Sequence, residues 1–311
     1  MKVLITPRGF ATYGLADVAR LESKGFKVIY NDTGVAYTTS ELLELAKDAK
    51  GIIVGVDDLS KEVLQQLPDL QAICKFGVGV DNIDLDYTKE KKIAVGRTVG
   101  SNSLSVAEHV VAMMFMDAKN LYTSVHEVKQ GKWNKPTGYE IQEKKLGIIG
   151  FGMIGKHLAR IANGLGMEVY ANDVVGISKE DKENYQVKEV ERDTILSTCD
   201  YVSLHIPLLP ETRHSISTRE FKMMKTSACL LNAARGGVVD EEALYEALIH
   251  KEIRSACFDV FSVEPPNVHE PLLKLDNFLL TPHTASRTVE AETRTCKMTT
   301  DFMLENIQRR S

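Results

Sequence analysis

The chain has 311 residues, which is enough for two domains with separate cores. A hydrophobic content of 43% and a charged content of 26% are ordinary for a globular protein. The net charge of −5 gives no electrostatic attraction to nucleic acid or to an anionic membrane, and no segment approaches an uninterrupted membrane span. Neither nucleic acid nor a membrane is therefore expected as a partner.

The cysteines are scattered and include no C-x-x-C pair. They are Cys74, Cys199, Cys229, Cys257 and Cys296. Most lie in apolar strand-like runs, where buried and reduced thiols are the default, and residues 1–13 read as a strand and a polar turn rather than a signal peptide. A cytoplasmic protein without a metal site is expected.

The first 95 residues alternate between strand and helix patterns. Strands are expected at residues 3–6, 27–30, 51–55, 70–75 and 93–95, and helices at about 14–25, 41–48 and from 60 to just before Pro68. Ser40 and Ser60 suit the N-termini of the last two helices. Alternation of this kind predicts a parallel sheet with helices on both faces.

A loop with two glycines, Gly77 and Gly79, follows the fourth expected strand. Backbone N–H groups in such a loop are suited to binding an anion. A tight turn before the helix expected from about Leu85 explains the glycines equally well. The residues themselves leave both interpretations open.

A long apolar helix is expected at residues 105–119, where the methionine content suits a buried connector. Residues 120–143 are more polar and carry the only tryptophan, Trp133. The length and polarity of this segment predict an exposed excursion that is a candidate for an oligomer contact.

The clearest motif lies in residues 144–173. An apolar strand at 146–149 leads into Gly150, Gly152 and Gly155, spaced as G-x-G-x-x-G; a helix follows from Met153, and a strand at 167–172 ends at Asp173. The glycines allow a tight turn, a close approach to a pyrophosphate and close packing of helix on strand, and the helix start offers N–H groups to phosphates. Three glycines also occur in ordinary turns, but this context indicates a dinucleotide site.

The second half repeats the alternation after a charged, loop-like stretch that runs to about Lys188. Strands are expected at 201–205, 229–232, 256–260 and 278–280, and helices near 192–197, 218–225, 240–250 and 288–309. Two consecutive doubly wound units predict an α/β protein with one cofactor domain and one other domain.

Functional groups of open parallel sheets lie just past the carboxyl ends of strands. Arg235, Glu264 and His283 occupy such positions. Reduction of a carbonyl by hydride needs a proton donor, for which histidine is suited near neutral pH, and an arginine fork matches a substrate carboxylate. A carboxylate beside an imidazole favours its protonated form.

Each of these candidates has an ordinary alternative. Arg235 in a glycine-rich loop is typical of a surface charge, and Glu264 before Pro265 is typical of a turn. His205 ends a strand just as His283 does. Residue types alone do not decide between these interpretations.

Several ordered motifs together resemble the D-isomer-specific 2-hydroxyacid dehydrogenases, above all the phosphoglycerate-dehydrogenase branch. They lie at residues 76–84, 105–109, 200–205, 207–212, 232–240, 258–265 and 281–285. The resemblance implies an oxidoreductase that uses NAD to interconvert a D-2-hydroxy acid and its 2-oxo acid. It also implies a flavodoxin-like substrate domain of residues 1–99 and 287–311, a Rossmann NAD-binding domain of residues 100–286, and a homodimer formed through the segment around residues 100–140.

The same resemblance implies roles for matching positions. Arg235 would clamp the substrate carboxylate and carbonyl, His283 would be the acid/base, and Glu264 would hydrogen-bond His283. Substrate would also be bound at Phe76, Gly77, Val78 and Gly79, partly through backbone amides. The positions implied to contact NAD are Val106, Gly150, Gly152, Met153, Ile154, Gly155, Asp173, His205, Ile206, Pro207, Thr212, Ala233, Ala234, Arg235, Asp259, His283 and Ala285.

Two departures from the family bear on the substrate. Residues 97–100 read Arg-Thr-Val-Gly where the family often has Asn-Thr-Pro-Gly, and residues 55–58 read Gly-Val-Asp-Asp where phosphoglycerate-specific members usually carry an arginine. A substrate without a phosphate at its far end is therefore expected. The alternatives are D-3-phosphoglycerate dehydrogenase proper, a formate or phosphite oxidiser of the same superfamily, and a non-enzymatic NAD-sensing protein like the corepressors of this fold.

Overall fold

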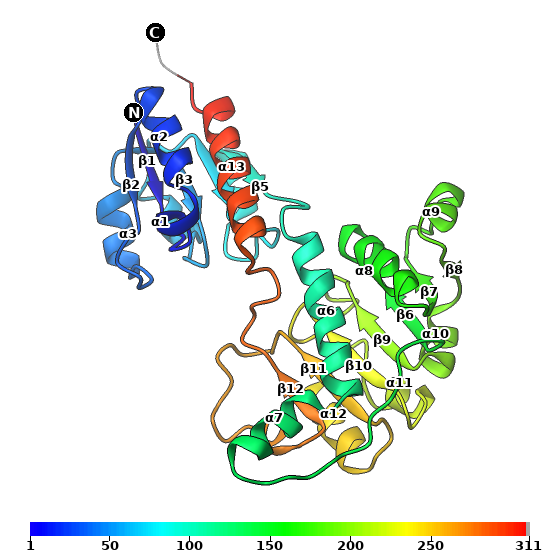
Figure 1. The fold of residues 1–311 in the computed structure, drawn as a ribbon. Coiled ribbons are helices and arrows are strands. Elements are labelled where there is room, and N and C mark those ends of the chain that lie inside the picture. The colour runs from blue at the N-terminus through cyan, green and yellow to red at the C-terminus, as the bar shows by residue number, and fades with distance from the viewer. Residues whose placement is uncertain (309–311) are drawn as a thin grey trace. The chain divides into compact units, whose positions relative to one another are not determined.

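The computed structural model describes residues 1–308, and the chain divides into two compact units (Figure 1). The first unit comprises residues 1–102 together with the C-terminal segment from Arg287, and the second comprises residues 103–286. The chain leaves the first unit after residue 102, whereas a boundary after residue 99 was expected. Hydrogen bonds within the first unit hold the residues around this boundary. Thr98 N donates to Gly77 O (2.9 Å), and Ser101 accepts from Arg294 Nε (2.9 Å).

The first unit contains a five-stranded parallel sheet in the order β2-β1-β3-β4-β5. Its strands are β1 (Lys2–Ile5), β2 (Lys27–Tyr30), β3 (Ala49–Val54), β4 (Ala72–Lys75) and β5 (Ala94–Arg97). Its helices are α1 (Phe10–Tyr13), α2 (Leu15–Ser23), α3 (Thr39–Ala46), α4 (Lys61–Leu64), α5 (Leu85–Glu90) and α13 (Val289–Asn306). The order reverses between β1 and β3, as in the flavodoxin-like doubly wound fold that was expected.

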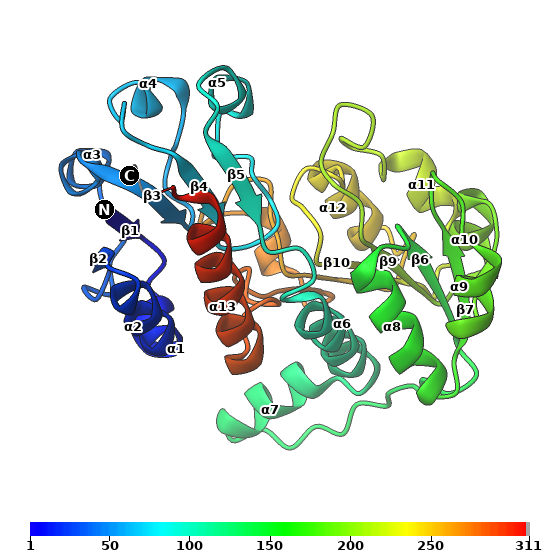
Figure 2. The same cartoon turned by 90° about the horizontal axis from the view of Figure 1, so that it is seen from above.

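Helices cover both faces of this sheet, with α1, α2 and α13 on one face and α3, α4 and α5 on the other (Figure 2). Val3 and Ile5 pack in one core with Met303 of α13, whereas Leu4 packs in the opposite core with Leu42 of α3. Successive residues of a strand point to opposite faces, so a strand covered on both sides is apolar throughout.

Three expected boundaries in this unit differ from the structure. The single helix expected at residues 14–25 is two helices, α1 and α2, that meet at Gly14. The cap of α3 is Thr38 rather than Ser40, because Glu41 N donates to Thr38 Oγ1 while Thr38 N donates to Glu41 Oε2. The last helix ends at Asn306, and the expected terminal residue Arg309 lies outside the described residues.

The second unit contains a seven-stranded parallel sheet in the order β12-β11-β10-β9-β6-β7-β8. Its strands are β6 (Lys145–Ile149), β7 (Glu168–Asn172), β8 (Lys188–Glu189), β9 (Tyr201–Leu204), β10 (Cys229–Asn232), β11 (Ser255–Phe258) and β12 (Phe278–Leu280). Its helices are α6 (Ser103–Ala118), α7 (Leu121–Lys129), α8 (Met153–Gly164), α9 (Lys179–Asn184), α10 (Arg192–Thr198), α11 (Thr218–Met223) and α12 (Glu241–Ile249), with a 3₁₀ turn at η1 (Pro271–Lys274). The order reverses between β6 and β9, which is the Rossmann arrangement, and the predicted fold class of two doubly wound units is confirmed.

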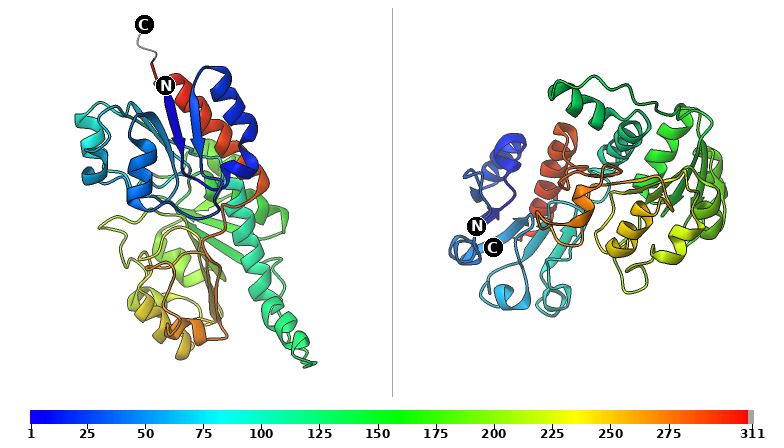
Figure 3. Two further views of the ribbon diagram at one scale, coloured as in Figure 1. Left: turned by 90° about the vertical axis from the view of Figure 1, so that its left-hand side faces the viewer. Right: turned by 90° about the horizontal axis from the view of Figure 1, so that it is seen from below.

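Residues 120–143, expected only to be an exposed excursion, and residues 174–188, expected to be loop-like, both contain regular secondary structure. The first segment holds α7, which continues from α6 and extends away from the sheet of its unit (Figure 3). The second holds α9 and β8. Neither helix has a buried residue. The residues of α9 are all polar, so no apolar periodicity indicates a helix there, whereas α7 carries Leu121, Val125 and Val128 at helical spacing within a segment that is polar overall.

All five cysteines are free and buried. Burial raises the pKa of Cys74 and of Cys296 to about 12 and that of Cys199 to about 11. Within residues 1–308, no helix combines the length and the apolar character needed to cross a membrane.

Candidate active site

The glycine loop lies where β6 and β9 end, at the reversal of the strand order. Gly150 has a φ of 96°, and a side-chain carbon there would lie 2.4 Å from the carbonyl oxygen of His205. Only glycine permits both the backbone conformation and this approach. A side-chain carbon at Gly152 would meet nothing within 4 Å, so the backbone there is open to a ligand.

The backbone N–H groups in the first turn of α8 have no hydrogen-bond acceptor within the described part of the protein. Gly152 is its N-cap without a side-chain hydrogen bond, and the first turn carries no acidic residue. Within the part of the chain that the structure describes, the N–H groups of Met153, Ile154 and Gly155 donate to no protein acceptor. Orphan donors at the positive end of a helix dipole are the arrangement that binds a pyrophosphate.

Asp173 follows β7 and lies against the glycine loop. Its Oδ2 accepts from Phe151 N (2.7 Å) and its Oδ1 accepts from Val175 N (3.1 Å). A carboxylate has about four lone-pair sites, so two remain for a ribose hydroxyl. Asp173 therefore shapes the loop as well as offering acceptors to a nucleoside.

His205 follows β9 and has a buried polar atom without a partner. Its Nε2 lies 2.8 Å from Ser203 Oγ, while Nδ1 is buried and has no hydrogen-bond partner among residues 1–308. Burial lowers the pKa of His205 to about 4, so the ring is neutral at neutral pH. Buried polar atoms are rarely left unsatisfied, and a bound group beside this strand end would supply the partner. The next turn is closed by Thr212 Oγ1, which donates to Pro207 O (2.6 Å).

Arg235 lies in a tightly fixed turn after β10. The buried side chain of Asn232 accepts from Ala234 N (3.0 Å) and donates to Arg235 O (3.0 Å), and Arg235 Nη1 donates to Ala234 O (2.7 Å). A side-chain carbon at Gly236 would lie 2.0 Å from Phe261 O, so glycine is required where this turn meets the loop after β11. That loop leads to Glu264, which brings two of the candidate residues onto neighbouring strand ends.

The structure pairs His283 with Glu264. His283 Nδ1 lies 2.7 Å from Glu264 Oε2, and Glu264 Oε1 accepts from Phe261 N (2.9 Å). Because a carboxylate only accepts hydrogen bonds, Nδ1 carries the hydrogen and Nε2 is the atom left for proton exchange. His283 has a φ of 52°, a left-handed conformation that is uncommon outside glycine.

Asp259, expected to contact NAD, is engaged with the turn that carries His283. It is 1% exposed; Oδ1 accepts from Thr284 N (2.9 Å) and Thr281 Oγ1 (2.5 Å), and Oδ2 accepts from Ala285 N (2.8 Å). His109 of α6 contacts Thr281 Oγ1 through Nε2 (3.0 Å). No chemical signal in the sequence singles out His109 or Thr281, although both lie within motifs that carry the family resemblance.

Two further expected NAD contacts lie on or beside this helix. Val106 is buried in α6, and Ala285 is buried with its carbonyl accepting from Ser105 Oγ (2.6 Å). Ala233 is buried at the end of β10, and Ile206 lies beside Gly150.

The loop after β4 belongs to the first unit and has a mixed hydrogen-bond pattern. Gly77 N donates to Thr98 Oγ1 (3.0 Å), so this amide is already used within the protein. The N–H groups of Val78 and Gly79 donate to no acceptor within residues 1–308. Of the amides expected to bind substrate, those of Val78 and Gly79 are the ones left for a ligand. The ring of Phe76 packs against Phe10 with centroids 5.8 Å apart.

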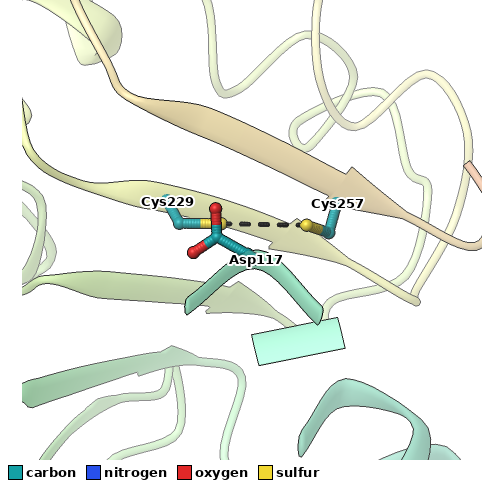
Figure 4. Close-up of side chains that lie close together, drawn as sticks. All are labelled: Asp117, Cys229 and Cys257. Carbon is teal, nitrogen blue, oxygen red and sulfur yellow. Dashed lines mark hydrogen bonds between the residues drawn. The ribbon is translucent and has the colours of Figure 1, made fainter. Parts of the chain in front are cut away.

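Asp117 of α6 lies close to Cys229 of β10 and Cys257 of β11 in the second unit (Figure 4). The Asp117 carboxylate forms an ion pair with Arg254 Nη1 (2.8 Å) and accepts hydrogen bonds from Tyr201 and Ser255. A carboxylate that is neutralised by Arg254 and already has three partners is poorly suited to a metal ion. We assign the cluster to a buried polar network rather than to a metal centre.

The Rossmann strand order and the open start of α8 behind Gly152 are the features of a dinucleotide-binding α/β domain. Asp173 after β7 and the unsatisfied Nδ1 of His205 lie at the same edge of this sheet. The model of the D-isomer-specific 2-hydroxyacid dehydrogenase NAD-binding domain matches residues 111–285. The chain is 39% identical over 267 residues to D-3-phosphoglycerate dehydrogenase of Methanocaldococcus jannaschii, covering 84% of this chain and 50% of that protein. It is 36% identical over 259 residues to hydroxypyruvate reductase of Thermotoga maritima, covering 82% and 83%.

Solved structures agree with this match. D-lactate dehydrogenase of Aquifex aeolicus, solved with NAD and lactic acid, superposes with a TM-score of 0.80 at 30% identity, covering 97% of this chain and 93% of the other. The chain belongs to the D-isomer-specific 2-hydroxyacid dehydrogenase family, and NAD is its cofactor. It spans about half the length of the archaeal phosphoglycerate dehydrogenase that it matches.

Proposed function

We propose that this protein is an NAD-dependent oxidoreductase that interconverts a D-2-hydroxy acid and its 2-oxo acid. The observation that carries the proposal is the 2.7 Å contact between His283 Nδ1 and Glu264 Oε2 within the NAD-binding domain of this family. Bound NADH supplies the hydride for the carbonyl carbon. The residues of the chain then have to hold the substrate and to move one proton.

His283 is the proton donor in the reducing direction. Glu264 holds the hydrogen on Nδ1, so the imidazolium gives up the proton on Nε2 to the developing alkoxide and regains it in the reverse reaction. Arg235 binds the carboxylate and the carbonyl oxygen of the substrate, since its guanidinium presents a fork of donors. The amides of Val78 and Gly79, which donate to no acceptor within residues 1–308, are proposed as further substrate-binding groups.

A panel of 2-oxo acids assayed with NADH tests this proposal. Steady consumption of NADH with glyoxylate, pyruvate, hydroxypyruvate or a branched 2-oxo acid is expected, and the reverse reaction should use the D-hydroxy acid in preference to the L-enantiomer. The His283→Asn protein is the matched control. Reduction of NAD by formate or phosphite without any turnover of 2-oxo acids, or NADH binding with no turnover at all, would contradict the proposal.

We infer further that the substrate carries no phosphate at its far end. The loop after β3 presents Asp57 and Asp58, and the nearby ammonium of Lys75 donates to Gly55 O (2.6 Å) and to Asn82 Oδ1 (2.6 Å). A half-buried phosphate without its own cation is costly. The relatives do not decide this point, because a phosphoglycerate dehydrogenase and a hydroxypyruvate reductase match at 39% and 36% identity.

The substrate proposal is tested by comparing kcat/KM for 3-phosphohydroxypyruvate and hydroxypyruvate. The unphosphorylated acid is expected to be the better substrate. A preference of about tenfold for the phosphorylated acid, which corresponds to about 1.4 kcal/mol, would contradict the argument from the loop. In that case the exposed Arg8 and Arg97 become the residues to replace.

A homodimer formed through α7 is the assembly that we propose. Leu121, Tyr122 and Val125 are 48%, 56% and 54% exposed, and Trp133 just beyond the helix is 76% exposed. A cluster of exposed large apolar side chains marks an interaction surface. Sedimentation of the parent should give a dimer, Val125→Asp should shift it towards the monomer, and Thr123→Asp on another face of the helix should not. A monomeric parent would contradict the proposal.

A reducing compartment, the cytoplasm, fits the five free and buried thiols. Nucleic acid is not among the proposed partners because the net charge is −5. Localisation of the tagged protein in cells, and retention on a DNA or RNA column at low salt, test these two points.

A further inference from the structure

The turn that carries His283 is held by a buried carboxylate. Asp259 accepts hydrogen bonds from the backbone N–H groups of Thr284 (2.9 Å) and Ala285 (2.8 Å), the two residues that follow His283. It also accepts from Thr281 Oγ1 (2.5 Å), two residues before His283. The conformation of the turn therefore depends on where the Asp259 carboxylate lies.

The hydrogen-bond chemistry of Thr281 brings in a second histidine, His109 of α6. A threonine hydroxyl has one hydrogen, and its contact with Asp259 Oδ1 is much shorter than its alternative contact with Phe258 O (3.4 Å). Thr281 therefore donates to Asp259 and accepts from His109 Nε2 at 3.0 Å. His109 consequently carries a hydrogen on Nε2, and the same nitrogen lies 3.5 Å from Asp259 Oδ1.

Helix α6 contacts both ends of the turn formed by residues 281–285. Ser105 Oγ donates to Ala285 O (2.6 Å), and His109 lies four residues along the helix on the same face. His283 stands between these two anchors with a φ of 52°, a conformation that costs a histidine about 1 kcal/mol and persists only where its surroundings fix it.

We propose that His109 is a positioning residue for the acid/base step. By donating to Thr281 it orients the hydroxyl towards Asp259, and Asp259 then fixes the turn so that His283 faces Glu264. This inference rests on the proposed function of His283. A misplacement of about 1 Å at a reacting group is enough to lower a rate by about a hundredfold, so the hydrogen bond from α6 has a catalytic consequence although His109 is not required to touch the substrate.

Two replacements of His109 separate the hydrogen bond from simple packing. His109→Leu removes the donor, whereas His109→Gln keeps an N–H donor at a similar distance from the backbone. We expect kcat to fall about tenfold to a hundredfold in the leucine variant and by no more than about threefold in the glutamine variant, with KM for NADH within about twofold of the parent in both. The isotope effect with deuterated NADH should rise in the leucine variant if the chemical step becomes limiting. Glu108→Gln, an exposed change on the same helix, is the control.

Thr281→Val, which removes the hydroxyl at nearly constant shape, completes a double-mutant cycle with His109→Leu. If both act through one hydrogen-bond chain, the double variant loses less than the product of the single losses. Exchange of the Thr284 and Ala285 amides should accelerate in both single variants, and this readout needs no activity. If His109→Leu folds poorly, the nearly isosteric Thr281→Val variant still tests the hydrogen-bond chain.

Unchanged kcat and amide exchange in His109→Leu would overturn the inference, and so would a glutamine variant as impaired as the leucine one. If the parent protein reduces no 2-oxo acid, the proposed function is contradicted. Faster amide exchange in the His109 and Thr281 variants would still support the hydrogen-bond network in that case.

Discussion

Replacing Glu264 by glutamine tests most directly whether its charge acts on His283. The two side chains are in contact at 2.7 Å, and they are 38% and 49% exposed. An ion pair this accessible to water is stabilised by about 1 kcal/mol rather than by the several kcal/mol of a buried pair. A free energy of this size corresponds to about a fivefold factor in an equilibrium constant.

The direction of the effect follows from the charge. The Glu264 carboxylate stabilises the protonated form of His283, so the neutral glutamine lets the proton leave at lower pH. Reduction of the 2-oxo acid needs the protonated form, and its kcat/KM should therefore decline at a lower pH in Glu264→Gln than in the parent. Oxidation of the hydroxy acid needs the unprotonated form, so its kcat/KM should begin to rise at a lower pH than in the parent.

Profiles of kcat/KM against pH in both directions provide the measurement. Glu241→Gln is a matched control, because Glu241 belongs to the neighbouring helix, accepts from Ser262 N (2.8 Å) and makes no contact with His283. An unshifted profile for Glu264→Gln, or a shift to higher pH, would refute the assignment of Glu264. A shift of equal size in the Glu241 control would show that net charge alone is responsible.

Three other outcomes are expected. His283→Asn should lower the rate of reduction by about 10²- to 10⁴-fold while NADH affinity, measured by fluorescence, stays close to that of the parent. NADH should be preferred to NADPH by at least about tenfold in kcat/KM, because Asp173 repels a 2′-phosphate and residues 174–178 contain no arginine; equal use of both would count against this. Asp117→Ala should lower the free energy of unfolding by about 3 kcal/mol, measured with urea, because it leaves the Arg254 guanidinium unpaired.

The sequence predicted the parts of the fold that have strong local signals. The apolar run before Gly150, the glycine spacing and the helical pattern from Met153 correspond to β6, the loop and α8. Segments without a buried face were not predicted, as α7 and α9 show. The cap at Thr38 was missed because serine at position 40 suits the same role, and only the reciprocal bonds with Glu41 distinguish the two.

Position at strand ends was enough to select Arg235, Glu264 and His283 as candidates, since the carboxyl ends of parallel strands share one edge of a sheet. It was not enough to show which of them touch. The contact between Glu264 and His283 joins residues 19 positions apart, and that between His109 and Thr281 joins residues 172 apart. No local pattern encodes such contacts, because the first depends on how β11 and β12 pair and the second on how α6 packs against the sheet.

Two carboxylates lie near His283, and their exposure separates their roles. Asp259 is 1% exposed and its oxygens accept hydrogen bonds from two backbone N–H groups, so losing its carboxylate would leave those donors buried and unsatisfied. Glu264 is 38% exposed and gives one oxygen to a backbone N–H and the other to the imidazole, so it can respond to the charge of His283 without unfolding its loop. A buried acceptor saturated by amides is suited to fixing geometry, whereas a half-exposed carboxylate with one oxygen on the imidazole is suited to influencing a proton. Asp259→Asn should therefore affect stability and amide exchange first, and Glu264→Gln should affect the pH profile first.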